Sequence, residues 1–151
     1  MVDTKNTTTA GEIAAERASC VRAGPITFTV EYRRVVQAGV EVSGPTIRVV
    51  GADDDHEYLR FDMFNRDAHY HYMLPSTGAD EQAERVVVLD TVAEGDPVSW
   101  AIDRLRGRFA PMLANAGGQR LVELLEEDTL GRAVDEVEAL CRAAQARAGP
   151  A

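Results

Sequence analysis

Hydrophobic and polar residues alternate through the first half of the chain. After Pro25, the apolar residues Ile26, Phe28, Val30 and Tyr32 take every second position, with polar residues between them. A period of two is typical of a strand with one apolar and one polar face. Four further runs of strand-like composition follow at 46–50, 57–64, 69–74 and 85–92. The segments between the runs are short and rich in turn-forming residues, which predicts an antiparallel meander of about five strands.

A helical period replaces this alternation before and after the predicted sheet. Between residues 10 and 23 apolar side chains recur at helical spacing, and Gly24-Pro25 supplies a stop signal, so we expect an N-terminal helix here. A second helix is predicted to begin at Asp96-Pro97, because aspartate caps helices and proline fits the first helical position. Pro111 is expected to kink or interrupt this helix near its end.

The C-terminal part of the chain predicts one or two further helices. Gly117-Gly118 marks a break, after which residues 119–127 are interpreted as a short helix. A longer helix is predicted from residue 129 or 130 to about residue 147. Its apolar residues, from Leu130 to Cys141, lie along one side.

Together these elements predict an α+β fold. We expect an N-terminal helix, a curved antiparallel sheet of about five strands, and two or three C-terminal helices packed on one face of the sheet. The chain has 151 residues, a length typical of one domain, and we assign residues 10–148 to that domain. Residues 1–9 are polar and lack periodicity, which predicts a disordered N-terminus.

The composition narrows the classes of function. Hydrophobic residues make up 45 % of the chain and charged residues 27 %, which are values typical of a globular domain. The formal net charge is −9, and this disfavours binding to nucleic acid. The sequence contains neither an apolar run of about 18 residues, the length of a membrane span, nor a signal-peptide core. We therefore expect a cytoplasmic protein without a membrane partner.

The two cysteines, Cys20 and Cys141, lie in segments that are predicted to be helical. Neither cysteine has a partner at a spacing typical of a metal site. We interpret both as structural thiols, since nothing in the sequence implies an oxidising compartment that would favour a disulfide.

Histidine is concentrated in one short segment of the chain. His56, His69 and His71 are the three histidines, and they lie within sixteen residues of one another. On a strand, His69 and His71 project from the same face because side chains alternate. Such an H-x-H pair can chelate one metal ion. The pair resembles part of the cupin motif, but that motif continues with a glutamate that YMLPSTG after His71 lacks, so we do not assign the chain to cupins.

The apolar positions also predict which residues share a face with this pair. The apolar residues of 57–64 and 69–74 can face one another across a hairpin only if paired residue numbers sum to an odd value. Phe64 would then lie opposite either His69 or Asp67. In both registers one face of the sheet carries four polar side chains, which are Arg60, Asp62, His69 and His71.

Two histidines and a carboxylate are a known ligand set for zinc and for non-haem iron. We therefore hypothesise that His69, His71 and Asp62 bind a divalent metal ion, zinc or iron. The same three residues are the candidate catalytic groups, because a histidine can act as a general acid or base without metal while Asp62 orients it. Glu31 and Arg33, on the polar face of the first predicted strand, are candidate neighbours.

Arg60 and Tyr58 are the candidate substrate-binding residues. Arg60 suits an anionic group of a small molecule, since its planar guanidinium matches carboxylate and phosphate. Strand alternation places Tyr58 on the same face as Arg60 and Asp62, where it could line a pocket. A small molecule bound at this cluster would make the protein a small lyase, an isomerase or a metal-dependent enzyme.

A different interpretation gives the cluster no chemical role. Histidine and tyrosine are common on strands, so these residues can be solvated or hydrogen-bonded parts of a sheet. The protein would then be an interaction or homodimerisation module that uses an exposed sheet edge or the amphipathic C-terminal helix. The two interpretations differ in whether the loss of His69 and His71 abolishes the binding of a ligand or metal.

Overall fold

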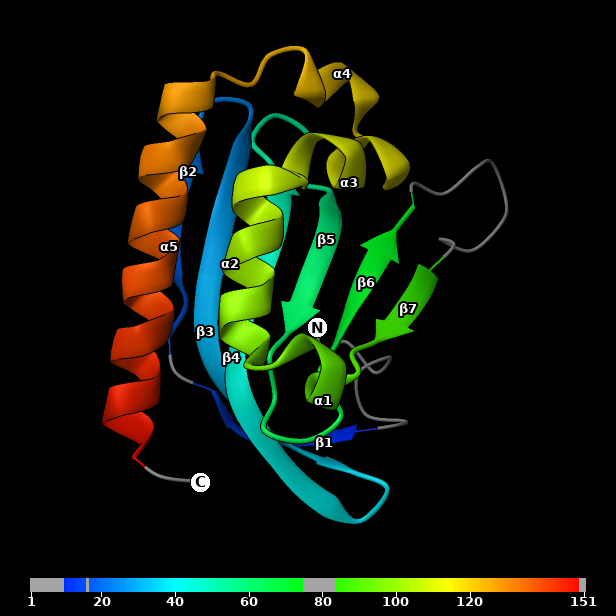
Figure 1. Cartoon of the computed structure of the whole chain (residues 1–151), viewed down its shortest axis with the longest axis vertical. Helices are drawn as coiled ribbons and strands as arrows, with labels where there is room; N and C mark the ends of the chain where they lie inside the picture. The colour runs from blue at the N-terminus through cyan, green and yellow to red at the C-terminus, as the bar shows by residue number, and fades with distance from the viewer. Residues whose placement is uncertain (1–9, 16, 75–83, 150–151) are drawn as a thin grey trace.

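The structure is a computed structural model that describes residues 10–15, 17–74 and 84–149. Within these residues, an antiparallel sheet is covered by helices, so the predicted α+β class is confirmed (Figure 1). The strands are β1 (Ala10–Ala15), β2 (Ser19–Ala23), β3 (Ile26–Gln37), β4 (Val40–Gly51), β5 (Glu57–Asp62), β6 (His69–Met73) and β7 (Glu84–Val88). The helices are α1 (Thr91–Glu94), α2 (Pro97–Gly107), α3 (Phe109–Asn115), α4 (Gln119–Val122) and α5 (Glu127–Ala148).

The strands lie in the order β1-β3-β4-β5-β6-β7, and β2 pairs with the other half of β3. From β3 to β7 each strand is beside the next one in the chain, which is the predicted meander. The turn between β3 and β4 consists of Ala38 and Gly39, which both have positive φ, as a two-residue type I′ turn requires. The long β3–β4 hairpin extends beyond the helices and curls at its end (Figure 1).

The N-terminal helix predicted for residues 10–23 is wrong, because this segment forms β1 and β2. Gly24-Pro25 is the two-residue turn between β2 and β3, in which Ala23 pairs with Ile26 and the glycine has a φ of 59°. Val21 and Ala23 of β2 are buried, with an exposed residue between them. Pairing with the edge of β3 and packing against α5 outweigh the helix propensity of the alanines.

The sheet also has more and longer strands than the five predicted. The additional strands are β1 and β2, and β4 begins at Val40, inside the loop predicted for residues 39–45. Val40 and Val42 alternate with polar residues, but the Gly44-Pro45 pair obscures this strand signal. The last strand ends at Val88 rather than at residue 92, because Asp90 caps α1. The predicted N-terminus 1–9 and the predicted loop 75–82 lie outside the described residues.

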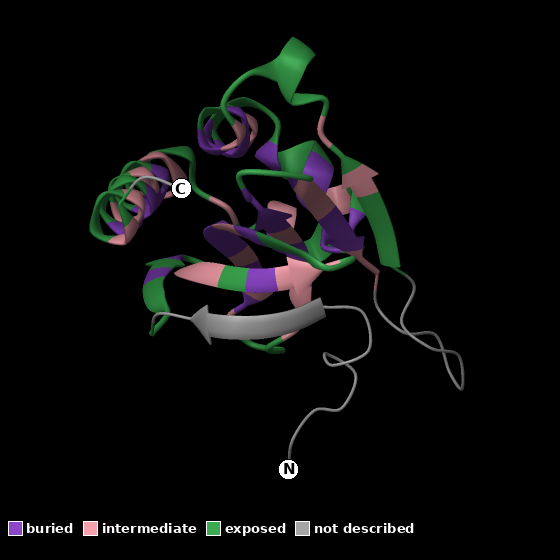
Figure 2. Ribbon diagram, turned by 90° about the horizontal axis from the view of Figure 1, so that it is seen from below, coloured by how far each residue is buried: buried purple, intermediate pink, exposed green. Residues whose placement is uncertain are grey.

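The main core lies between the sheet and the helices, where buried residues are concentrated (Figure 2). Phe61 of β5 and Tyr70 of β6 stack with their ring centroids 5.8 Å apart. The ring of Trp100 of α2 lies 6.4 Å from that of Phe61 and 5.2 Å from that of Tyr70, so it packs α2 against both strands. Because Phe61 and Tyr70 face the helices, their neighbours along each strand face the opposite side.

The helical half of the chain follows the predicted order. Asp96 caps α2 by accepting a hydrogen bond from the backbone N–H of Ser99 at 2.9 Å. The helix ends before Arg108, so the break comes ahead of the predicted kink, and Pro111 lies in the first turn of α3, where proline is tolerated. The short helix predicted at 119–127 is confirmed only for the four residues of α4, because residues 123–126 are not helical and Glu127 begins α5. None of the described helices has the length and apolarity required to cross a membrane.

The apolar side of α5 packs inside the fold. Val134, Val137 and Cys141 are buried, and α5 contacts β2, β3 and β4. Burial raises the pKa of the Cys141 thiol to about 12. Cys20 lies on β2 rather than on the predicted helix and is exposed. Both cysteines are free thiols, and of the two only Cys141 is buried as a structural thiol would be.

Gly44 marks a close approach between β4 and the segment that follows β5. The backbone N–H of Met63 donates to the carbonyl of Pro45 at 2.9 Å. A Cβ atom on Gly44 would lie 2.1 Å from the carbonyl oxygen of Met63. This contact holds the chain where it leaves β5, before it returns as β6.

We expect Gly44→Ala to lower the free energy of unfolding by about 3 kcal/mol, because the added methyl group would meet backbone, which cannot move aside easily. Gly131→Ala is the matched control, since a Cβ on this glycine of α5 meets nothing within 4 Å. It should raise stability by about 1 kcal/mol, as alanine favours the helix. Urea unfolding followed by circular dichroism measures both variants, and similar stabilities would contradict the close approach at Gly44.

Candidate metal centre

The sheet face opposite the helices carries two rows of facing side chains. The first row runs from β3 to β7 and consists of Glu31, Thr46, Asp62, His69 and Val88. The second row lies two residues away along each strand and consists of Thr29, Arg48, Arg60, His71 and Val86. Facing residues of antiparallel strands have Cβ atoms about 4.5–5.5 Å apart. The register alone therefore gathers most of the polar cluster.

The β5–β6 register is one of the two that the sequence predicts. Asp62 faces His69 and Phe61 faces Tyr70, which corresponds to the register with Phe64 opposite Asp67. The predicted common face is therefore confirmed for its four residues, which are Arg60, Asp62, His69 and His71. Their chemical roles remain a prediction.

Asp62 lies at the centre of this face, and only 1 % of the residue is exposed. Its Oδ1 accepts hydrogen bonds from Thr46 Oγ1 at 2.9 Å and from Arg33 Nη1 at 3.1 Å. Its Oδ2 has three close neighbours, which are His71 Nε2 at 3.0 Å, His69 Nε2 at 3.1 Å and Arg60 Nε at 3.3 Å. One carboxylate thus connects three other strands to β5. We call these six residues the Asp62 cluster.

The outer nitrogen of each imidazole is held by a second group. His69 Nδ1 donates to the backbone carbonyl of Asp67 at 2.7 Å, and His71 Nδ1 lies 2.5 Å from a carboxylate oxygen of Glu84. These contacts fix the rotation of both rings and direct both Nε2 atoms toward Asp62. In metal sites, the second nitrogen of a ligating histidine is usually held by a carbonyl or carboxylate in this way.

The cluster also shifts the proton affinities of its members. Burial on its own would raise the pKa of Asp62, but hydrogen bonds from His69 and His71 and the charge of Arg60 hold that pKa well below its usual value. Burial lowers the pKa of His69, but hydrogen bonds to Asp62 and to the carbonyl of Asp67 outweigh burial and raise it. Asp62 is therefore a carboxylate at neutral pH, and His69 holds its proton more tightly than a free imidazole does.

A second layer of ion pairs borders the cluster on β3, β4 and β5. Arg48 pairs with Glu31 and, at 2.9 Å, with Glu57. Glu57 also lies 3.6 Å from Arg60 Nη1. Both predicted neighbours therefore lie on this face of the sheet. Arg33 contacts Asp62 directly, whereas Glu31 pairs with Arg48 at the border of the cluster.

Tyr58 does not lie on the predicted face. The β4–β5 register shifts between Val49 and Val50, which makes Tyr58 the extra residue of a β-bulge. Its side chain is buried in the core, and its hydroxyl donates to Asp54 Oδ2 at 2.5 Å. Glu57 takes the position on the polar face that regular alternation predicts for Tyr58. The predicted placement of Tyr58 is wrong because the sequence carries no signal for the bulge.

Three contributors were not predicted as part of the site. Thr46 and Arg48 lie on a predicted strand, and their place beside the cluster follows from the β4–β5 register. Glu84 reaches His71 only through the pairing of β6 with β7. His56, the remaining histidine, lies outside the cluster, with its Nε2 2.8 Å from the carbonyl of Met73.

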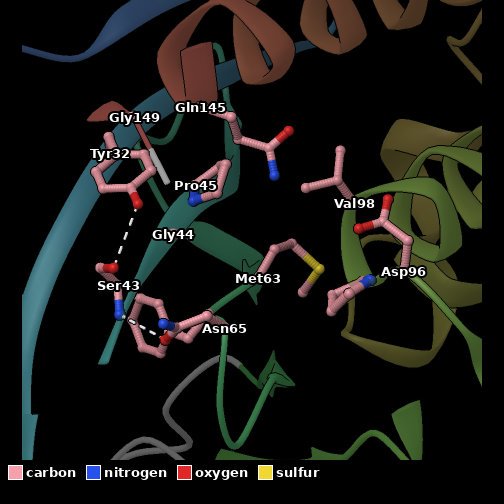
Figure 3. A pocket seen from close by; sticks show the side chains of 12 residues that line it. Tyr32, Ser43, Gly44, Pro45, Met63, Asn65, Asp96, Val98, Gln145 and Gly149 are labelled. Atoms are coloured by element: carbon pink, nitrogen blue, oxygen red, sulfur yellow. Dashed lines mark hydrogen bonds between the residues drawn. The ribbon is translucent and has the colours of Figure 1, made fainter. Parts of the chain in front are cut away.

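A cavity of about 240 Å³ lies apart from the cluster, between the start of α2, the end of α5 and β4. Figure 3 shows Tyr32, Ser43 and Asn65 along one wall, joined by hydrogen bonds of 3.2 and 3.1 Å. Gln145 and Val98 lie across from them. The lining includes no residue of the Asp62 cluster, so a ligand of the cluster would lie elsewhere, on the sheet face opposite the helices.

Comparison with known families gives one match. A profile described as a domain of unknown function, DUF7700, matches residues 20–141. The chain belongs to the DUF7700 family. No curated protein and no solved structure matches it. The matched residues extend from β2 into α5, so they include the whole Asp62 cluster of this DUF7700 domain.

The donor atoms of this DUF7700 domain fit a transition-metal ion. One ligand atom each from Asp62, His69 and His71 lies within 4.8 Å of the others. Zinc bonds of about 2.0–2.1 Å place neighbouring ligand atoms about 3.3 Å apart. The two Nε2 atoms are 3.0 and 3.1 Å from Asp62 Oδ2, so modest side-chain shifts would complete the ligand geometry.

Asp62→Asn tests whether the buried charge holds the cluster together. Without metal, we expect the variant to lose about 3 kcal/mol of unfolding free energy at neutral pH, because Arg33 and Arg60 then lack the anion between them. The pKa of Asp62 is lowered by folding. The loss should therefore be complete above about pH 4 and should shrink as the pH falls further and unfolded aspartate takes up a proton. Urea unfolding of wild type and Asp62→Asn over a pH series measures this loss of unfolding free energy.

Asp135→Asn is the control for this charge removal, because Asp135 makes an exposed ion pair with Arg106 at 2.8 Å. Its loss should cost less than about 1 kcal/mol. If the two variants were equally stable at neutral pH, Asp62 would not have the central role that its contacts indicate.

Proposed function

We propose that this protein binds a divalent metal ion, zinc or iron, through Asp62, His69 and His71, and that the metal site holds a small-molecule ligand. The observation that carries the proposal is the convergence of two Nε2 atoms on one buried carboxylate oxygen, at 3.0 and 3.1 Å. Two histidines and a carboxylate are the protein ligands of many zinc and non-haem iron sites.

The surroundings of both imidazoles support this proposal. The Asp67 carbonyl and the Glu84 carboxylate accept from the Nδ1 atoms, which leaves Nε2 as the metal-facing atom of each ring. The side chains of His69 and His71 are 13 % and 8 % exposed. The site is therefore largely shielded by its neighbours, and a small part of each imidazole stays accessible.

The ligand set also suits small-molecule chemistry. Three protein ligands leave coordination positions for water and for a donor atom of a bound molecule. A metal held in this way polarises a carbonyl group or lowers the pKa of bound water. Both effects are useful to a small lyase, an isomerase or another metal-dependent enzyme, which are the activities we propose for the cluster.

Metal analysis of the tag-free protein tests the proposal. After loading with zinc or iron(II) and removal of free metal, we expect wild type to retain about one ion per chain. A folded His69→Ala/His71→Ala variant should retain none, because it keeps only one of the three ligands. Elemental analysis gives the stoichiometry, and circular dichroism shows that the variant is folded.

His56→Ala is the matched control for the double variant, because His56 contacts the carbonyl of Met73 and lies outside the ligand set. It should retain the metal as wild type does. Wild type without metal after loading, or a double variant that retains the metal, would contradict the proposed function.

Homodimerisation is a second candidate function, and the edge strand β7 favours it. Val86 and Val88 are 50 % and 70 % exposed. Among the described strands, only β6 pairs with β7. Two copies can pair their β7 strands around a twofold axis, which would satisfy the edge backbone groups and cover the valines of both copies. The other proposed interface, the apolar side of α5, already packs against the sheet.

Light scattering over a range of protein concentrations tests this dimer. We expect wild type to approach twice the mass of one chain and Val88→Lys to remain monomeric, because a charge on β7 blocks edge pairing. Val92→Lys is the control, since Val92 is 96 % exposed on α1. A monomeric wild type at every concentration would exclude a dimer formed through β7.

A further inference from the structure

The Arg60 guanidinium lies beside two of the three ligand atoms of the proposed metal site. Its Nε donates to Asp62 Oδ2 at 3.3 Å, and its Nη2 lies 3.3 Å from His71 Nε2. Asp62 Oδ2 and His71 Nε2 are 3.0 Å apart. The guanidinium therefore bridges two of the three proposed ligand atoms from the neighbouring strands β5 and β6 (Figure 1). A metal ion bound between the same atoms would make the same bridge.

The charge of Arg60 suits its position. Two carboxylates, those of Asp62 and Glu84, contact the ring of His71 at 3.0 and 2.5 Å. Arg60 places a cation next to this group of acceptors, and its planar guanidinium lies beside both Asp62 and His71.

The contacts of Arg60 are long compared with those of its neighbours. Its third contact, from Nη1 to Glu57, is 3.6 Å. All three exceed the about 2.7–2.9 Å of a strong charge-assisted hydrogen bond. By contrast, Arg48 holds Glu57 at 2.9 Å, within this range. The Arg60 side chain is also 22 % exposed, so it already contacts solvent.

We propose that Arg60 is an internal competitor for the metal ion. It occupies the cation position of the site, and a metal ion binds by displacing it toward Glu57 and solvent. The inference rests on the metal-binding function proposed above. It gives Arg60 a regulatory role, because the metal affinity then depends on how readily this side chain leaves Asp62 and His71.

Zinc affinities of three proteins test the proposal, measured by competition with a chromophoric chelator. Arg60→Gln should bind zinc about tenfold more tightly than wild type, because no cation then occupies the position between the ligand atoms. Arg33→Gln is the matched control. It removes an equal charge beside Asp62, but its contact is to Oδ1, so it frees neither Oδ2 nor an imidazole nitrogen. We expect a change of no more than about threefold in this variant.

Equal tightening in Arg60→Gln and Arg33→Gln would overturn the proposal, since the effect would then come from charge and not from occupation of the site. In that case the metal-binding function would stand. If neither wild type nor Arg60→Gln bound zinc, both proposals would fail.

Hydrogen exchange at Arg60 gives a second test that needs no variant. In wild type, zinc should speed the exchange of the Arg60 Nε–H with water, observed by NMR, because the displaced guanidinium becomes solvated. An exchange rate that zinc leaves unchanged, in a protein that binds zinc, would overturn the proposal.

Discussion

The burial of one carboxylate is the constraint on which the polar face of this protein depends. A charged group this deeply buried is stable only when donors and cations surround it. Asp62 receives these contacts from β3, β4, β5 and β6, through Arg33, Thr46, Arg60, His69 and His71. A slip of any of these strands by one residue would turn its contacts away from Asp62. The strand register therefore brings the cluster together, and the contacts to Asp62 in turn stabilise that register.

The two faces of β5 and β6 carry different side chains, with core residues on one face and the Asp62 cluster on the other. Phe61 and Tyr70 face the helices, where Trp100 packs on both rings. The residues beside them, Asp62 and His71, face the opposite side of the sheet. Because the same strands are anchored in the main core, the side-chain atoms that we propose as metal ligands are held on a rigid frame, as a preorganised site requires. The Asp67 and Glu84 contacts then set the orientation of the imidazoles.

Much of the site could be predicted from the sequence, because strand alternation places His69 and His71 on the face of Asp62 in either register. Other features depend on contacts between distant residues. The segment before Gly24 has a helical spacing of alanines, yet it forms strands because the edge of β3 offers unpaired backbone groups. The bulge at Tyr58 and the contact of Glu84 arise from pairing between strands, which residue types alone do not reveal.

Histidine side-chain ¹⁵N spectra of the tag-free protein, recorded before and after addition of zinc, test the central claim most directly. The chain has only three histidines, so each ring can be assigned. We predict that Nε2 of both His69 and His71 takes the shift of a metal-bound nitrogen, while their Nδ1 atoms stay protonated and His56 does not change. Zinc that leaves all three rings unchanged, or that binds through Nδ1 or His56, would contradict a metal centre at Asp62.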